Sequence, residues 1–302
     1  MKRIQVVDLF CGLGGFSQGA SEAKCDVIVA IDCWDKSQKN HKINHPNCVH
    51  YTLKLGNTEN SVDKIADLIR QHIDFSKPWH LHGSPPCQKL SIANRKTGNV
   101  QEGMRLVFWY LDLVKKLNPD TWSMEQVSTV RKYLPNWIPN IQTLDASHYG
   151  TPQTRKRVFC GDGWVIDISD KKQTISPNDV LKELHKEGDL IRGYSVNRPI
   201  CVKGVYKGLK KVVGVDGTRK ITEPTFTICA SAPLKLEKQI GDNKTKKIRS
   251  LTIQESLILQ GFPKTYKIEG FMKDKRTMIG NAVCPPVSRM IMNKIQNNQK
   301  LD

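Results

Sequence analysis

The sequence predicts an α/β fold, with a mainly parallel sheet covered by helices on both faces and a second, smaller β-rich domain. Three observations lead to this prediction. Apolar runs of strand length alternate with segments of helical spacing in the first half of the chain. A Gly-rich turn follows the first apolar run. After about Gly163, short β-branched runs between glycines replace the alternating pattern.

The elements of the larger domain follow from hydrophobic spacing and from the residues that interrupt it. Apolar runs bounded by Gly, Asp or Pro predict strands, whereas apolar residues three and four apart predict helices. The predicted strands are residues 4–10, 27–31, 79–82 and 121–125, and the predicted helices are residues 62–73, 106–117 and a closing helix after Pro286. Such alternation is typical of a mainly parallel sheet with crossover helices.

The segment after about residue 163 differs in composition. Residues 192–220 contain eight basic residues and one acid, Asp216, and residues 212–217 predict a hairpin with an Asp-Gly turn. We therefore place the smaller domain at residues 186–276 and the larger domain at residues 1–185 and 277–302.

Charge indicates the class of partner. Lys and Arg number 47 against 29 Asp and Glu, which gives a net charge of +18 at pH 7. Such an excess favours a polyanionic partner, most often nucleic acid, although a solubilising basic surface would have the same composition. The apolar runs are too short to cross a bilayer, so we expect no membrane association.

The cysteines indicate a reducing compartment. There are nine, an odd number, and no two have the C-x-x-C spacing of a zinc knuckle. We therefore expect free thiols, an intracellular location and no metal. His80 and His82 could be metal ligands, but alternate positions on a strand that ends beside a loop explain them more simply.

The Gly-rich turn after the first strand is a candidate ligand site. Gly12, Gly14 and Gly15 leave the backbone open, so that a ligand can approach it closely. Asp32 ends the next strand, where a carboxylate can accept hydrogen bonds from ribose hydroxyls. The dinucleotide fingerprint would require Gly where Ser17 stands, so we expect an adenosyl ligand without a pyrophosphate. A purely structural turn is the alternative.

Two candidate reactive groups follow strands of the same predicted sheet. Cys87 lies in a loop stiffened by Pro85 and Pro86, at the position where α/β proteins have their active sites. A thiol there can be a nucleophile, although a buried structural Cys is the commoner role. Glu125 ends an apolar strand, so its carboxyl group is paired, protonated or catalytic; a helix cap or an ion pair is the alternative.

Two arginines form a further candidate site. Arg155 and Arg157 occupy alternate positions of a predicted strand and therefore point to the same side of it. Two guanidinium groups on one edge suit a phosphate or a base carbonyl, and a solvated basic strand is the alternative.

In this order, these segments resemble the DNA (cytosine-5) methyltransferase family, of the small restriction-modification or viral type. The similar motifs are residues 8–15, 86–88, 125–127, 153–157, 249–255 with 260–263, and 280–283. The resemblance extends from about residue 5 to residue 290. It omits only the basic β-rich segment, where the family has its variable target-recognition region.

The resemblance implies a Rossmann-like sheet that binds S-adenosylmethionine, released as S-adenosylhomocysteine, and methylation of carbon 5 of a cytosine flipped out of double-stranded DNA. Cys87 would add as a thiolate to carbon 6, and Glu125 would hold the N3 edge of the base. Arg157 would contact the base, and Arg155 would order the loop and the backbone. The residues implied for the cofactor pocket are Phe10, Gly12, Leu13, Gly14, Gly15, Asp32, Cys33, Leu106, Asn281 and Ala282.

The sequence departs from the family pattern at three places. Gln126 stands where the family has an Asn that braces the Cys87 loop. Thr52 stands where the family has an Asp that holds the adenine amino group. Residues 101–105 lack the usual Arg-Gly pair.

Two alternatives share parts of this pattern. A tRNA cytosine-5 methyltransferase would have the same motifs, but its Cys-Phe-Thr signature is missing from this sequence. A non-catalytic nucleic-acid-binding relative is disfavoured by the presence of Cys87, Glu125 and Arg157. By the resemblance we expect a monomer in the bacterial cytoplasm or inside a virus-infected cell.

Overall fold

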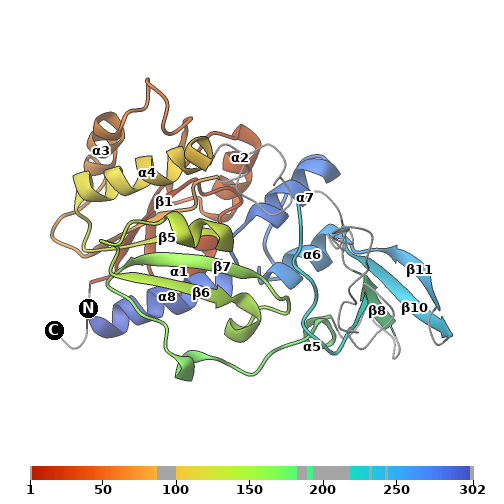
Figure 1. Ribbon diagram of the computed structural model, residues 1–302. Helices are drawn as coiled ribbons and strands as arrows, with labels where there is room; N and C mark the ends of the chain where they lie inside the picture. The colour runs from red at the N-terminus through yellow and green to blue at the C-terminus, as the bar shows by residue number, and fades with distance from the viewer. Residues whose placement is uncertain are drawn as a thin grey trace, which may run out of the picture.

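A computed structural model describes residues 2–86, 100–181, 189–192, 218–230, 233–241 and 244–299, and it confirms the α/β fold. The predicted nucleophile Cys87 and the predicted hairpin at residues 212–217 lie outside the described residues. Figure 1 shows a large α/β layered structure with a smaller sheet beside it.

The described strands of the large sheet are β1 (Gln5–Leu9), β2 (Asp26–Asp32), β3 (Val49–Thr52), β4 (Trp79–Gly83), β5 (Thr121–Val127), β6 (Asn140–Asp145) and β7 (Lys156–Asp162). Their order is β3-β2-β1-β4-β5-β7-β6. The pairs from β3 through β5 are parallel, whereas β7 is antiparallel to both β5 and β6. The prediction of a mixed, mainly parallel sheet is therefore confirmed.

Helices cover both faces of this sheet (Figure 1). They are α1 (Gly15–Glu22), α2 (Asp35–Asn44), α3 (Val62–Arg70), α4 (Val100–Leu117) and α8 (Pro285–Asn298), and short 3-10 helices lie at Ser128–Tyr133, Ala146–Tyr149 and Ile168–Asp170. α3 and α4 pack on the face that carries Val7 of β1, whereas α1 and α8 pack on the face that carries Val6. Successive strand residues point to opposite faces, so β1 contributes to two hydrophobic cores.

Local signals in the sequence set the helix starts. The Ser61 hydroxyl accepts a hydrogen bond from the Lys64 N–H and caps α3, and Pro285 occupies the first turn of α8, where its missing N–H costs nothing. The helix predicted at residues 106–117 begins earlier, at Val100.

A second sheet lies beside the first. Its described strands are β8 (Asp189–Arg192), β9 (Thr218–Lys220), β10 (Lys235–Gly241) and β11 (Lys244–Ser250), which pair antiparallel in the order β11-β10-β8-β9. With α5 (Pro177–Val180), α6 (Ile253–Gln260) and α7 (Met272–Asn281), it surrounds a third core that includes Leu13 of the Gly-rich turn. The domain boundary placed after residue 276 falls within α7 and stays a prediction.

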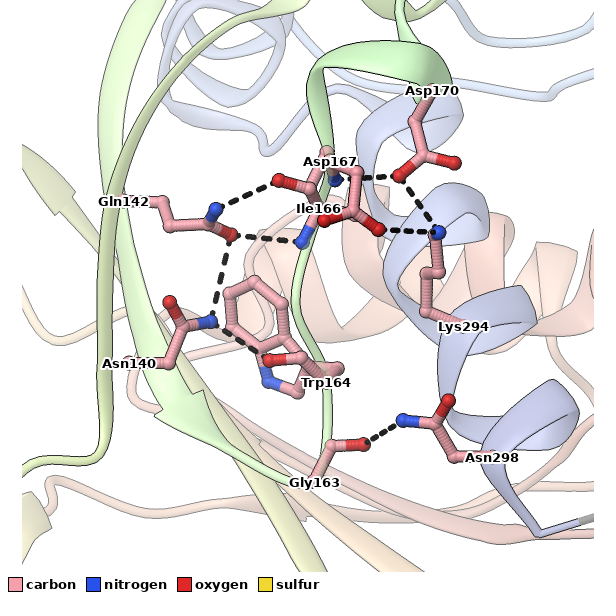
Figure 2. A network of polar contacts seen from close by, with 9 residues as sticks. All are labelled: Asn140, Gln142, Gly163, Trp164, Ile166, Asp167, Asp170, Lys294 and Asn298. Atoms are coloured by element: carbon pink, nitrogen blue, oxygen red, sulfur yellow. Dashed lines mark hydrogen bonds and ion pairs between the residues drawn. The ribbon is translucent and has the colours of Figure 1, made fainter. Parts of the chain in front are cut away.

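Ion pairs join α8, the closing helix, to the loop that follows β7 (Figure 2). Lys294 Nζ lies 2.8 Å from Asp170 Oδ2 and 3.3 Å from Asp167 Oδ2. On the other side of this loop, the Gln142 amide donates to the Ile166 carbonyl at 2.8 Å and accepts from the Ile166 N–H at 3.0 Å. This loop leaves β7 opposite Trp122, near the beginning of β5, whereas Gln142 lies in β6 opposite Phe159, the β7 residue that also pairs with Glu125.

The candidate site lies at one edge of the large sheet. Because β1, β2, β4 and β5 are parallel, their carboxyl ends meet there. The Gly-rich turn, Asp32, the loop through Pro85, and Glu125 lie at these ends, where open α/β sheets bind ligands. In the part of the chain that the structure describes, no helix is long and apolar enough to span a membrane.

Candidate active site

The Gly-rich turn between β1 and α1 packs closely against two other segments. Gly14 has a φ of 89°, and a Cβ atom on it would lie 2.8 Å from Cδ2 of His41 in α2. A Cβ atom on Gly15 would lie 2.0 Å from the carbonyl oxygen of Val283. A larger residue at either position would therefore strain or displace its surroundings, so packing requires the same glycines that the candidate ligand site requires.

Asp32 joins the end of β2 to this turn. Its Oδ2 accepts a hydrogen bond from the Gly12 N–H at 2.9 Å, and its Oδ1 accepts one from the Trp34 N–H at 2.8 Å. Burial raises the pKa of the Asp32 carboxyl group and outweighs the opposite effect of these hydrogen bonds. The Ser37 hydroxyl also donates to Asp32 Oδ1, at 3.3 Å. A carboxylate has about four acceptor positions, so Asp32 retains capacity for a hydroxyl group of a ligand.

Two apolar residues of the predicted cofactor pocket are Phe10, which packs against α4, and Leu106, which lies in α4. The ring of Phe10 contacts that of Trp109 edge-on, with centroids 6.1 Å apart. Leu106 lies against Gly56, where a Cβ atom would be 2.4 Å from its Cδ2. Phe10 and Leu106 thus come from the end of β1 and from the helix that follows the Cys87 loop.

The other residues of the predicted pocket differ in exposure. Leu13 and Ala282 are buried in the same core, so they shape the turn from behind. Cys33 and Asn281 are exposed, at the ends of β2 and α7. Their side chains are therefore accessible to a ligand.

An ion pair marks the end of β5. Arg157 Nε lies 3.1 Å from Glu125 Oε1, and the two side chains are only 22% and 13% exposed. The antiparallel register places Arg157 opposite Val127 and Glu125 opposite Phe159, so the pair is diagonal across β5 and β7. The structure thus brings together two residues that are 32 positions apart in the sequence, and it holds the carboxylate with a guanidinium group.

Gln126 connects β5 to the loop after β4. It is 1% exposed, and its Nε2 donates to the carbonyl oxygen of Pro85 at 2.5 Å. Pro85 lies two residues before Cys87. The Gln that replaces the family's Asn therefore braces the same loop through a backbone carbonyl.

Arg155 is directed toward the backbone. It is 4% exposed and donates from Nη1 to the Ile228 carbonyl at 3.3 Å and from Nη2 to the Gly280 carbonyl at 3.0 Å. Burial, together with the neighbouring positive charge of Arg157, lowers its pKa to about 10. Two backbone carbonyls thus take the place of the phosphate or base carbonyl considered for this residue, which agrees with the implied role in ordering the backbone.

Two glutamines that we did not predict as site residues support this arrangement. Gln153 is fully buried and donates to the Leu259 carbonyl at 3.0 Å and to Gln260 Oε1 at 2.7 Å. Gln260 in turn donates to the Ala282 carbonyl at 2.6 Å. Both glutamines lie within motifs of the family resemblance, so those motifs could have identified them as site residues.

A buried chain of hydrogen bonds lies below the Gly-rich turn and was also not predicted. Ser17 Oγ donates to Asp8 Oδ2 at 2.6 Å, and His41 Nε2 lies 2.9 Å from Ser17 Oγ. Burial raises the pKa of Asp8 to about 7. Burial also lowers the pKa of His41, whose ring is therefore neutral at pH 7. Ser17, which stands where a dinucleotide fingerprint has Gly, is thus a structural hydrogen-bond donor.

His80 and His82 have structural roles in β4. The two ring nitrogens of His80 lie 2.8 Å from the hydroxyls of Thr121 and Ser123. Those of His82 lie 2.8 Å from Ser123 Oγ and 2.9 Å from Ser84 Oγ. All four nitrogens have hydroxyl partners, so the simpler explanation of this pair holds.

The motifs and this geometry agree with a comparison against protein families. A model of the C-5 cytosine-specific DNA methylases matches residues 4–162 and 167–297. The chain belongs to this family. The resemblance is therefore confirmed, and the chain is a DNA (cytosine-5) methyltransferase.

Relatives of this methylase cover nearly its whole length. The Type II methyltransferase M.HindV of Haemophilus influenzae is 26% identical to it over 98% of each chain. A solved protein described as a DNA modification methyltransferase encoded within an E. coli prophage has a TM-score of 0.69 and 20% identity, over 98% of this methylase and 99% of that chain. The S. pombe Dnmt2 methyltransferase has a TM-score of 0.63 and 16% identity, over 98% and 99%. The two solved structures establish the fold.

Proposed function

We propose that this methylase transfers a methyl group from S-adenosylmethionine to carbon 5 of cytosine within a specific sequence of duplex DNA, as part of a restriction-modification system. The observation that carries the proposal is the partly buried Glu125–Arg157 ion pair beside the loop that Gln126 braces. The names of curated relatives, which are Type II methyltransferases, support the restriction-modification context. The net charge of +18 suits a duplex partner.

Cys87 is the nucleophile in the proposed reaction. Its thiolate adds to carbon 6 of a cytosine that has been turned out of the duplex. Glu125 donates a proton or hydrogen bond to N3 of the base, so that the negative charge of the thiolate addition can build up at carbon 5. After methylation, loss of the carbon 5 proton and of the Cys87 thiolate restores the aromatic ring.

Arg157 and Gln126 position these groups. The guanidinium group of Arg157 fixes the carboxyl group of Glu125 and neutralises its charge where both side chains are mostly buried. Gln126 holds the Pro85 carbonyl, which limits the conformations available to the loop that continues to Cys87. Arg155 acts at a distance by joining the start of β7 to residues 228 and 280.

The residues at the Gly-rich turn fit an adenosyl donor. Asp32 retains acceptor capacity for a ribose hydroxyl, and Phe10 and Leu106 supply apolar surface for an adenine ring. Ser17 is buried and bonded to Asp8, so the first turn of α1 lacks the Gly-lined approach that a pyrophosphate needs. S-adenosylmethionine supplies the methyl group when it is bound at this turn.

The replacement at Thr52 affects the same pocket. Thr52 pairs with Asp32 across β2 and β3, so it lies beside the proposed ribose contact. Its exposed hydroxyl replaces the carboxylate that the family uses for the adenine amino group. A neutral acceptor in this position forms a weaker hydrogen bond than a carboxylate does, so we expect modest affinity for the donor.

Mapping of the product tests the proposed function. The full chain is incubated with S-adenosylmethionine and mixed-sequence duplex DNA, and 5-methylcytosine is located at base resolution. We expect methylation at one short sequence. Methylation of tRNA but not of DNA would favour the tRNA alternative, and methylation of neither would favour the non-catalytic one.

A mechanism-based substrate tests the nucleophile separately. A duplex with 5-fluorocytosine at the mapped site should remain covalently attached to the enzyme, since fluorine does not leave as a proton does. Cys87→Ala should form no such adduct. An adduct with Cys87→Ala would show that another residue is the nucleophile.

A further inference from the structure

Three imidazoles and a thiol gather behind the Gly-rich turn, and the proposed methyl transfer uses none of them. His41 lies in α2, His45 follows this helix, Cys48 directly precedes β3, and His50 is the second residue of β3. His41, His45 and Cys48 are buried, and His50 is partly exposed. One possible ligand atom from each of His41, Cys48 and His50 lies within 4.8 Å of the other two.

Hydrogen bonds determine which nitrogen of His41 is free. Ser17 has one hydroxyl proton, which it donates to Asp8 at 2.6 Å. His41 Nε2, 2.9 Å from the same Ser17 oxygen, must therefore donate its own proton to it. The neutral ring then has its lone pair on Nδ1, the atom that lies 2.8 Å from His50 Nε2.

This arrangement is the one that metal-binding histidines have in proteins. A ligating His commonly donates its other N–H to a partner that is itself anchored, which fixes the orientation of the ring. Here that partner is Ser17, and Asp8 anchors Ser17. The lone pair on Nδ1 of His41, which accepts the His50 hydrogen bond without metal, is thus directed toward the other possible ligands before any metal binds.

We propose that His41, Cys48 and His50 bind a divalent transition metal, for which Zn²⁺ is the best fit. Two imidazoles and a thiolate are a ligand set that zinc prefers, and magnesium and calcium prefer oxygen ligands instead. Three atoms within 4.8 Å of one another can all be reached from a point about 2.8 Å away. Because zinc bonds measure about 2.0–2.3 Å, each ligand atom needs to move by less than about 1 Å.

His45 is available as a fourth ligand, with water as the alternative. Its ring centroid lies 4.6 Å from that of His41. Its Nε2 is buried and has no hydrogen-bond partner within the described residues. A buried ring nitrogen without a partner is uncommon, and an ion is among the usual reasons for one.

Metal binding changes two protons. Without metal, the Cys48 thiol donates to the Val49 carbonyl at 3.4 Å, and the proton of His50 lies between His50 Nε2 and His41 Nδ1. On binding, the thiol loses its proton to solvent, and the His50 proton moves to Nδ1 of the same ring, so that Nε2 can ligate. The metal joins α2 to β3 directly behind Gly14, whose Cβ position lies 2.8 Å from His41.

Titration with Co²⁺ tests this proposal without DNA or methyl donor, so its failure is separable from failure of the proposed function. The full chain, without a polyhistidine tag, is treated with a chelator and then titrated. We expect one equivalent to give intense tetrahedral d–d bands and a thiolate-to-cobalt charge-transfer band, both removed by Zn²⁺. A hundredfold excess of Zn²⁺ over its dissociation constant should raise the melting temperature by about 5 °C.

Matched variants assign the ligands. His50→Gln should weaken Co²⁺ binding by more than about a hundredfold, and Cys48→Ser should abolish the charge-transfer band. The controls His148→Gln and Cys25→Ser, which change a His and a Cys outside the cluster, should behave as the wild type does. Retention of binding by His50→Gln, or of the band by Cys48→Ser, would overturn the proposal.

A measurement on the unmodified chain covers the case in which a variant does not fold. X-ray absorption of the Zn²⁺-loaded protein should show nitrogen and sulfur neighbours at about 2.0–2.3 Å. A shell of oxygen neighbours alone, or no stoichiometric binding, would refute the site.

Discussion

Replacement of Gln126 by Ala tests whether its bond to Pro85 positions the Cys87 loop. Gln126 is 1% exposed, and the Pro85 carbonyl that it contacts at 2.5 Å is buried as well. A buried carbonyl without a donor costs about 1–3 kcal/mol, and the cavity left by the side chain adds to this cost. We therefore expect the free energy of unfolding to fall by roughly 2–4 kcal/mol.

The effect on catalysis should exceed what lower stability explains. A displacement of about 1 Å in a reacting group can cost about a hundredfold in rate. Single-turnover methyl transfer, at saturating DNA and donor and well below the melting temperature, should be slower in Gln126→Ala by about tenfold to a hundredfold. Gln126→Met keeps most of the side-chain volume but has no N–H, so it should lose the same rate with a smaller loss of stability.

Gln142→Ala is the matched control. Gln142 also braces a loop of the same sheet, through two hydrogen bonds with Ile166 (Figure 2), but it lies in β6, the outermost described strand, which β7 separates from β5 and Glu125. It should lower stability and leave the single-turnover rate unchanged. A Gln126→Ala rate within about twofold of the wild type, or an equal loss in Gln142→Ala, would refute the positioning role.

Three further predictions follow from other contacts. Glu125→Gln keeps the shape of the side chain but removes the charge that pairs with Arg157. Single-turnover methylation should therefore slow by about a hundredfold or more, while the melting temperature changes little. A rate within about tenfold of the wild type would contradict a role of Glu125 at the base. Arg155→Met leaves two backbone carbonyls without their guanidinium donor, so thermal unfolding should occur roughly 5–10 °C lower, and an unchanged melting temperature would contradict this. Burial raises the pKa of Asp8 from 3.8 to about 7, so between these pH values the folded state holds a proton that the unfolded state releases. The contribution of this proton to stability is complete below about pH 4 and is lost as the pH rises through about 7. Asp8→Asn should lack this loss, so urea unfolding at pH 5 and pH 8 should show a decrease of a few kcal/mol in the wild type that the variant does not share.

Strand ends could be located from the sequence, and with them the principal site residues. Apolar runs identified the strands before Asp32 and Glu125, and parallel strands necessarily bring their carboxyl ends together. The Gly-rich turn was recognisable for the same reason, since it directly follows such a run. These features depend on neighbours in the sequence, which spacing reveals.

Contacts between distant segments could not be predicted in this way. The acceptors of Arg155 lie 73 and 125 positions further along the chain. The role of Ser17 depends on a histidine in the next helix. The candidate metal ligands have the spacing H-x3-H-x2-C-x-H, and a search for C-x-x-C pairs does not find it. Their convergence requires the packing of α2 and β3 against the Gly-rich turn.

The antiparallel direction of β7 has a consequence for exchanging the proposed target-recognition domain between relatives. Because β7 runs opposite to β5, its first residues, not its last, reach the active-site edge. The segment that enters β7 also pairs with residue 225, where the Thr225 N–H donates to the Pro152 carbonyl and the Thr154 N–H donates to the Thr225 carbonyl. A module transplanted without residues 225–228 would also remove the Ile228 carbonyl to which Arg155 donates, so functional chimaeras should have their junctions outside this stretch.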